Sequence, residues 1–205
     1  MRKFPVLFLL ILFSIAGMGQ SYQFFTYGIP EGLCDKFAYT INQDQDGFLW
    51  VGTTRGLCRF DGRVFDQEFE GDSVPASIAF SSFMDSQGRL WFGHENGLLS
   101  VLEDGSFRLI TPDPEFLSPI RDIQEDDRGN ILVLCQQNGI MIIDRDMDIR
   151  YVGDPFAGSF LNGFQITPDG NLLVGTNNGL GIYRYDSDLG TYIPVSYTHL
   201  RAHET

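Results

Sequence analysis

Residues 46–53 read Asp-Gly-Phe-Leu-Trp-Val-Gly-Thr, and residues 87–94 read Gln-Gly-Arg-Leu-Trp-Phe-Gly-His. The third copy, over residues 128–135, reads Arg-Gly-Asn-Ile-Leu-Val-Leu-Cys, and the fourth, over residues 169–176, reads Asp-Gly-Asn-Leu-Leu-Val-Gly-Thr. The copies begin 41 residues apart, and a second glycine follows each of them. Self-similarity at a fixed period predicts a protein built from repeated structural units.

Each unit contains short apolar runs separated by glycine-rich turns, which is the pattern of four short strands. A period near 40 residues with four strands per unit is typical of a propeller blade. Helical solenoids of similar period need long runs with a 3.6-residue periodicity, and the sequence has none. We therefore predict an all-β fold in which residues 22–195 form four consecutive four-stranded blades of a larger, incomplete β-propeller ring.

The recurring residues are predicted to be structural. Glycine tolerates the positive φ that a sharp strand reversal requires. Trp50 and Trp91 share one position of the repeat, which Leu132 and Leu173 occupy in the other copies. We interpret the two indoles as packing between blades, in preference to platforms for sugar rings. The predicted structural positions are Gly47, Trp50, Gly52, Gly56, Gly88, Trp91, Gly93, Gly97, Gly129, Gly139, Gly170, Gly175 and Gly179.

The N-terminal segment has the three-part layout of a secretory signal peptide. Arg2 and Lys3 precede an apolar run, which small residues and polar Gln20 follow. The uncharged stretch is shorter than the roughly 20 residues of a spanning helix, so we predict a cleaved leader over residues 1–19. No second apolar run follows, and we expect no membrane span in this chain and an exported, periplasmic location.

The two ends of the repeat region also carry predictions. Tyr22 to Tyr27 read as a strand whose Phe24 precedes Phe65 by one period, so the chain is predicted to begin with the outermost strand of a blade. Its three partner strands are missing from the sequence. Residues 196–205 break with the repeat and are predicted to be a non-native tail, in which case the natural protein continues past residue 195.

Net charge and cysteine content limit the binding partners and the disulfides that we expect for this chain. The formal net charge is -13, which disfavours binding to nucleic acid and to anionic polysaccharides, although a local basic pocket overrules such an average. The 3 cysteines allow at most one disulfide, and we interpret Cys34, Cys58 and Cys135 as small apolar residues inside strands.

No motif for a metal, a cofactor or catalysis is complete. Asn42, Asp44 and Asp46 resemble the first half of a calcium loop, but Thr53 stands where the bidentate glutamate belongs. His199 and His203 have helical spacing, but the residue after His199 is not the glutamate of a zinc protease. Only one histidine, His94, lies within the repeats, at a strand end where a surface or turn role is the simplest interpretation. We therefore predict no metal site, no cofactor and no enzyme activity of this chain.

One known family matches these residues. Residues 25–33 read Phe-Thr-Tyr-Gly-Ile-Pro-Glu-Gly-Leu, and with residues 41–53 and 56–62 they resemble the two-component regulator propeller repeat. The resemblance extends over four repeats, although Leu132 and Leu134 depart from the pattern. It implies the N-terminal periplasmic sensor part of a hybrid two-component histidine kinase of Bacteroidetes-type bacteria, with a possible homodimer in the full-length protein. It also implies recognition of glycan breakdown products and control of polysaccharide-utilisation genes.

A ligand site is predicted where loops of successive blades meet at one mouth of the ring. The side chains of these loops are polar and rich in amides, which suits an oligosaccharide or another small ligand. The alternative is a free secreted propeller that acts as a glycan-active enzyme or an adhesin. The candidate rim residues are Arg55, Glu95, Asn96, Gln137, Asn138, Asn177 and Asn178.

Overall fold

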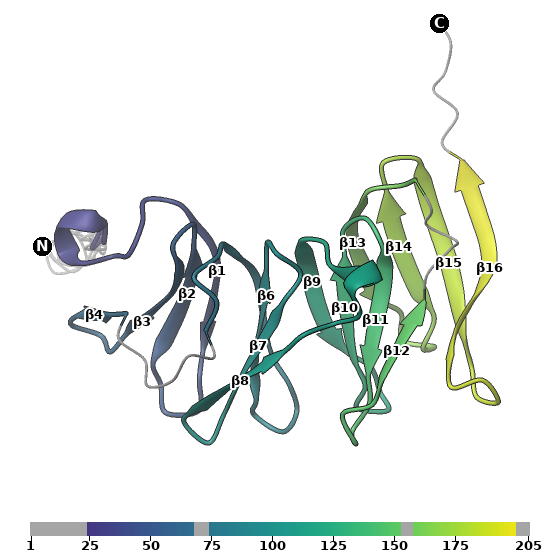
Figure 1. Ribbon diagram of the computed structural model, residues 1–205, viewed down its shortest axis with the longest axis horizontal. Helices are drawn as coiled ribbons and strands as arrows, with labels where there is room; N and C mark the ends of the chain where they lie inside the picture. The colour runs from purple at the N-terminus through teal and green to yellow at the C-terminus, as the bar shows by residue number, and fades with distance from the viewer. Residues whose placement is uncertain (1–23, 68–73, 153–157, 200–205) are drawn as a thin grey trace, which may run out of the picture.

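The computed structural model describes residues 24–67, 74–152 and 158–199. Across these ranges, four antiparallel four-stranded sheets follow one another along the chain and stand side by side without closing into a ring (Figure 1). Each sheet is a simple meander, in which consecutive strands are neighbours. The prediction of four consecutive blades of an incomplete β-propeller is confirmed.

The blades follow the repeat of the sequence. Blades 1 and 2 consist of β1 (Ala38–Gln43), β2 (Leu49–Thr53), β3 (Gly56–Phe60), β4 (Phe65–Asp66), β5 (Ala79–Met84), β6 (Leu90–His94), β7 (Leu99–Glu103) and β8 (Ser106–Ile110). Blades 3 and 4 consist of β9 (Ile120–Glu125), β10 (Ile131–Cys135), β11 (Gly139–Ile143), β12 (Ile149–Val152), β13 (Leu161–Ile166), β14 (Leu172–Thr176), β15 (Gly179–Asp186) and β16 (Thr191–His199). Short 3-10 helices lie at η1 (Ile29–Glu31) and η2 (Pro114–Phe116).

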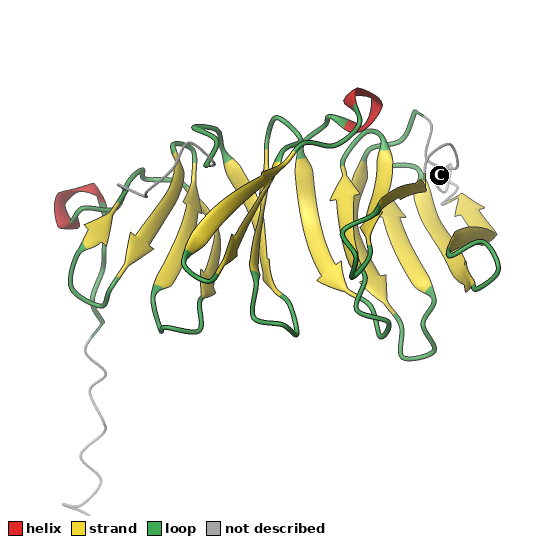
Figure 2. Ribbon diagram, turned by 60° about the horizontal axis from the view of Figure 1, so that its bottom comes forward, coloured by secondary structure: helices red, strands yellow, loops and turns green. Residues whose placement is uncertain are grey.

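The first strands of the four blades lie at a common edge. β1 contacts β5, β5 contacts β9, and β9 contacts β13. Figure 2 shows the sheets standing side by side. The first strands are therefore the inner strands of the propeller, and their side chains meet from blade to blade.

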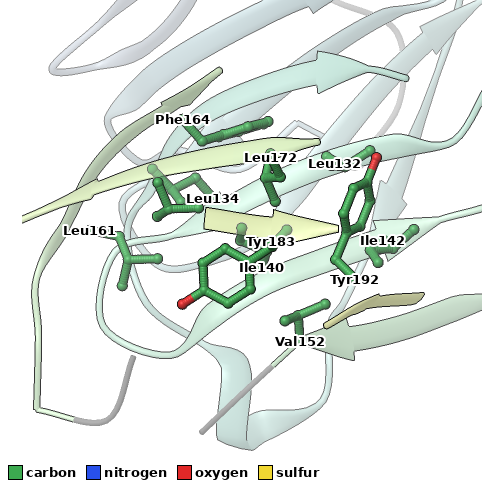
Figure 3. Close-up of a cluster of buried hydrophobic side chains, with 11 residues drawn as sticks. Leu132, Leu134, Ile140, Ile142, Val152, Leu161, Phe164, Leu172, Tyr183 and Tyr192 are labelled. Carbon is green, nitrogen blue, oxygen red and sulfur yellow. The ribbon is translucent and has the colours of Figure 1, made fainter. Parts of the chain in front are cut away.

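The hydrophobic core lies between blades. One buried cluster joins Leu132 and Ile140 of blade 3 to Leu161, Phe164 and Tyr192 of blade 4 (Figure 3). A second cluster joins blades 2 and 3, and a third joins blades 1 and 2. A small fourth cluster lies within blade 1, where Cys34 packs against Val51 and Cys58. The three larger clusters each need side chains of two blades, so a single blade has no complete core of its own.

Strand β10 shows how the sequence serves two interfaces at once. Successive side chains of a strand point to opposite faces of the sheet. Ile131, Val133 and Cys135 belong to the cluster shared with blade 2, and Leu132 and Leu134 belong to the cluster shared with blade 4. All five residues are buried, which explains the uninterrupted apolar run of the third repeat.

Both tryptophans lie in these interfaces. The exposed fraction of Trp50 is 2% and that of Trp91 is 0%, so neither indole offers a ring face to a sugar. The ring of Trp50 contacts Phe92 and Phe107 of the next blade, with centroids 5.9 and 5.3 Å away. Edge-to-face contacts of this kind add to the burial of apolar area.

A carboxylate closes the turn after each of the first three inner strands. Asp85 is the clearest case: its Oδ1 accepts from the backbone N–H groups of Gln87 and Arg89 at 3.0 and 2.8 Å. Its Oδ2 accepts from Arg89 Nε at 2.6 Å and from Trp91 Nε1 at 2.8 Å. Asp44 and Asp126 form equivalent turns one period away on either side. Asp44 is one of the acidic residues that resemble a calcium loop. Its carboxylate accepts from backbone N–H groups of its own turn and from the indole N–H of Trp50.

The repeat glycines meet two different demands. Gly47 and its counterparts in the other blades have φ between 77° and 90°, which the turns require. Gly52 has no positive φ, but a Cβ there would lie 2.7 Å from the backbone oxygen of Ala79 in the next blade. The third blade has Leu134 at this position, and it packs in the same cluster as Leu161 of blade 4.

The interpretation of the cysteines is wrong for two of the three. Cys34 and Cys58 form a disulfide, which ties the segment before β1 to strand β3. The two residues lie 24 positions apart, a separation that gives no cue from sequence alone. Cys135 is a buried strand residue, as predicted, and burial raises the pKa of its thiol to about 12.

His94 is not the surface residue that the sequence predicts. It ends strand β6 with an exposed fraction of 0%, and its Nε2 lies 2.8 Å from Ser100 Oγ. Burial lowers the pKa of the imidazole to about 4. Thr53 occupies the same repeat position in blade 1, where its hydroxyl donates to Gly56 O.

The structure tests the predictions for the two ends of the repeat region only in part. The predicted first strand, Tyr22 to Tyr27, is not formed over residues 24–27, and its first two residues lie outside the described residues. Strand β16 continues to His199, whose backbone pairs with Gly179. The predicted leader over 1–19 and residues 200–205 of the tail lie outside the described residues, and the non-native origin of the tail stays a prediction.

The carboxylate of Asp85 is expected to stabilise the chain strongly. Asp85→Ala leaves the buried Arg89 without its partner and should lower the free energy of unfolding by about 3 kcal/mol or more. Asp46→Ala, in the equivalent exposed turn of blade 1, should change it by less than about 0.5 kcal/mol. Urea unfolding of both variants measures the difference, and equal effects would contradict this role of the carboxylate.

The cysteine arrangement predicts a definite pattern of thiol reactivity. The folded chain should show no reactive thiol, because Cys135 is buried with a raised pKa and the other two cysteines are oxidised. In denaturant the count should rise to one, and with added reductant to all 3 cysteines of the sequence. Reduction of the folded chain should also cost about 3 kcal/mol of stability. Three thiols in denaturant alone would mean that the disulfide is absent.

The lowered pKa of the buried His94 leads us to expect that the stability of the chain depends on pH. Below pH 6.5 the unfolded chain gains a proton on this imidazole, whereas the folded chain stays neutral until about pH 4. The free energy of unfolding should therefore fall by about 2 kcal/mol from pH 7 to pH 5 on account of this group. His94→Thr, which copies blades 1 and 4, should remove that part of the loss. Urea unfolding of the wild type and of His94→Thr at pH 7 and pH 5 tests it. An equal loss of unfolding free energy in the two proteins would refute the assignment.

Candidate functional site

The candidate rim residues occupy the turns between the second and third strands of the four blades. In blade 1 this turn follows Thr53, which pairs with Ala38 at the start of the inner strand β1. The same pairing recurs in blade 2 between His94 and Ala79 and in blade 4 between Thr176 and Leu161. The rim turns and the beginnings of the inner strands therefore share one end of the blades, which we call the mouth.

Backbone hydrogen bonds tie these turns to the segments that enter the blades. Glu95 N–H donates to Ile78 O at 2.9 Å, and Asn177 N–H donates to Phe160 O at 3.0 Å. In blade 3, Gln136 N–H donates to Pro119 O at 2.9 Å. The mouth is thus a framework of paired backbone rather than a set of independent loops.

Several of the predicted rim amides serve this framework. Asn177 Oδ1 accepts from Phe160 N–H at 2.8 Å, and Asn178 Nδ2 donates to Ser159 Oγ at 3.0 Å. Asn138 Nδ2 donates to the backbone oxygen of Glu115. These amides bind neighbouring segments and so hold the turns in place. Fewer of the predicted rim amides are therefore free to bind a ligand than the sequence indicates.

The other rim residues leave their side-chain groups open. The side chains of Arg55, Glu95 and Gln137 are exposed and form no hydrogen bond or ion pair with the described part of the chain. Asn96 uses its Oδ1 to accept from Leu98 N–H at 3.2 Å within its own turn. The mouth therefore presents an arginine, a carboxylate and an amide on three successive blades.

A row of side chains that sequence reasoning missed lies beside the rim turns. Each inner strand has a register shift near its start, and the residue skipped by the pairing is Tyr39, Phe80, Arg121 or Asn162. The rings of Tyr39 and Phe80 lie 5.0 Å apart, and the Arg121 guanidinium lies 4.4 Å from the centroid of Phe80. The 41-residue spacing of these four varied residues is the signal that would have revealed them.

A cavity of about 580 Å³ lies at the opposite end of the blades. It is lined by the turns after β1 and β5 and by the turn between β7 and β8, and none of the predicted rim residues borders it. Its walls include the carboxylates of Asp46, Glu103 and Asp104. Arg59 also lines it from blade 1, and its guanidinium pairs with Asp66 at 3.0 Å. This cavity is therefore separate from the mouth and acidic in character.

Burial keeps the pair formed by His94 and Ser100 from acting on a substrate. The imidazole of His94 and the hydroxyl of Ser100 are hydrogen bonded, but both residues have an exposed fraction of 0%. A nucleophile and its base must reach the substrate, and burial prevents this here. No group of three His, Cys, Asp or Glu residues that would hold a metal ion occurs in the described ranges.

Comparisons with known proteins agree with this architecture. Residues 32–55 match the Two component regulator propeller family. Histidine kinase P4 of Formosa agariphila is 35% identical over 60 residues, which are 29% of this chain and 4% of that protein. The chain thus spans only a small part of the curated relative that it matches.

Solved structures show the same fold. The extracellular domain of a hybrid two component system from B. thetaiotaomicron aligns with a TM-score of 0.61 and 21% identity, over 88% of this chain and 25% of that chain. Virginiamycin B lyase from Staphylococcus aureus aligns with a TM-score of 0.60 and 19% identity, over 77% of this chain and 54% of that chain. At these identities, sensors and enzymes alike share the propeller fold. Residues 32–55, which include strands β1 and β2, match the two component regulator propeller repeat, and the described residues form a run of four propeller blades.

Proposed function

We propose that this chain is the ligand-sensing propeller of a two-component signal transduction protein. The observation that carries the proposal is the family match over residues 32–55, which lies in the same chain as the similarity to a histidine kinase. The signal detected is a glycan-derived ligand, and the output is control of polysaccharide-utilisation genes. The catalytic kinase domain belongs to a further part of the protein.

An exported location is part of this proposal. The disulfide between Cys34 and Cys58 is typical of proteins in an oxidising compartment such as the bacterial periplasm. The leader layout of residues 1–19 supports the same location, although these residues lie outside the described ranges. Among the helices of the described part, none is long and apolar enough to cross a membrane.

The geometry of the mouth favours binding over turnover. Polar side chains of three successive blades lie there on turns that backbone hydrogen bonds hold to the entering segments. A ligand that contacts several blades at once changes how they sit against one another, because each blade is packed only on its neighbours. Binding energy at the mouth is thereby coupled to the arrangement of the blades, which is what a sensor requires.

The native gene sequence beyond the codon for Val195 tests the proposal. We expect further repeats with the period of 41 residues, then one membrane-spanning segment, then the sequence motifs of a histidine kinase. The reading of that locus needs no folded protein and does not depend on the ligand. A stop codon soon after Val195, without a kinase, would contradict the signalling role and favour a free secreted propeller.

A further inference from the structure

We propose that Tyr39, Phe80 and Arg121 form a subsite for an acidic sugar ring, one that carries a carboxylate or a sulfate. We call these three residues the inner row. The inference rests on the proposed function, since it names the chemical class of the glycan that the mouth would bind. It adds to the rim residues a set of side chains that belong to strands rather than to turns.

The position of the inner row follows from the bulges of the inner strands. A bulge residue has no partner opposite it, and its side chain is directed away from the regular alternation of the strand. Because the bulge recurs at the same place in each blade, Tyr39, Phe80 and Arg121 come together from three different blades. Bulges of this kind commonly aim side chains at functional sites.

The contacts within the inner row are continuous. Tyr39 meets Phe80 edge to face at an interplanar angle of 82°, and the Arg121 guanidinium lies over the ring of Phe80. Tyr39 keeps an exposed fraction of 47%, and Arg121 is also exposed. The row therefore offers an aromatic surface next to a cation, both of them open to solvent at the mouth.

Arg121 lacks a partner carboxylate among the described residues. Its guanidinium forms no ion pair with any carboxylate in the described part of the chain, although four other arginines do. The neighbouring Asp122 is directed elsewhere: its carboxylate accepts from Ile123 N–H at 2.9 Å and from Gln124 Nε2 at 3.2 Å. In a chain with a formal net charge of -13, an unpaired and stacked arginine is an anion-binding group.

The chemistry of the row selects the ligand class. Aromatic rings present flat apolar faces that pack against the C–H face of a pyranose ring. A guanidinium donates in a planar fork that matches a carboxylate or a sulfate. Its contact with the ring of Phe80, 4.4 Å from the centroid, keeps the guanidinium beside the aromatic side chains. A sugar ring on Tyr39 with an acidic substituent toward Arg121 satisfies both groups at once. A neutral sugar leaves the guanidinium without a partner.

Binding of the purified chain to an array of matched oligosaccharides tests the inference. The array carries uronate-bearing, sulfated and neutral oligosaccharides of equal length, so the carboxylate and sulfate arms are separated. We expect acidic members to bind, and Arg121→Gln to weaken that binding about tenfold. Arg121→Lys keeps the charge but loses the fork and should give an intermediate loss. Raising the salt concentration should weaken the wild type more than Arg121→Gln.

Arg108→Gln is the matched control, because Arg108 is an exposed arginine of the outer strand β8, with the same charge removed. It should bind acidic oligosaccharides as the wild type does, and thermal melts should show all three variants folded. Acidic binding that Arg121→Gln leaves unchanged, or binding of neutral members alone, would overturn the subsite and leave the sensor proposal standing. Absence of binding to every oligosaccharide would overturn the glycan ligand of the proposed function together with the subsite.

Discussion

The burial of each blade against the next is the interaction on which the rest of this structure depends. The three large apolar clusters each combine side chains of two consecutive blades. A strand such as β10 is therefore apolar on both faces, and its successive residues serve different neighbours. The fold is held together by a repeated interface and not by one central core, so its stability grows from contacts between neighbouring units.

That interface requires hydrogen-bond acceptors in the turns at one end of the blades. Trp50 and Trp91 fill the space between blades, and their indole nitrogens need an acceptor when they are buried. Asp44 and Asp85 supply it at 2.7 and 2.8 Å while they also close the turn after the inner strand. In blade 3, Asp126 closes its turn in the same way and accepts instead from the hydroxyl of Tyr192 at 3.3 Å. In each of these three turns, one carboxylate thus links local chain reversal to the packing between blades.

The mouth at the other end is freer to vary. The bulge position carries Tyr39, Phe80, Arg121 and Asn162 in turn, which are two aromatic residues, a cation and an amide. The backbone around them stays the same, because hydrogen bonds between turns and entering segments hold it. Binding specificity can therefore change at these positions without loss of the fold, which is the arrangement expected of a sensor scaffold.

The sequence by itself predicted four consecutive four-stranded blades and the recurring positions of glycine and tryptophan. These features repeat every 41 residues, and many of them follow from local chemistry, namely positive φ at turns and alternation of apolar side chains along strands. Only the tertiary structure decided the pairing of Cys34 with Cys58, the burial of His94, the use of Asn138, Asn177 and Asn178 as framework, and the meeting of Tyr39, Phe80 and Arg121. Each of these depends on which residues from different strands or blades come within contact distance. A repeat pattern shows that positions are equivalent, whereas packing in three dimensions decides which of the equivalent positions face one another.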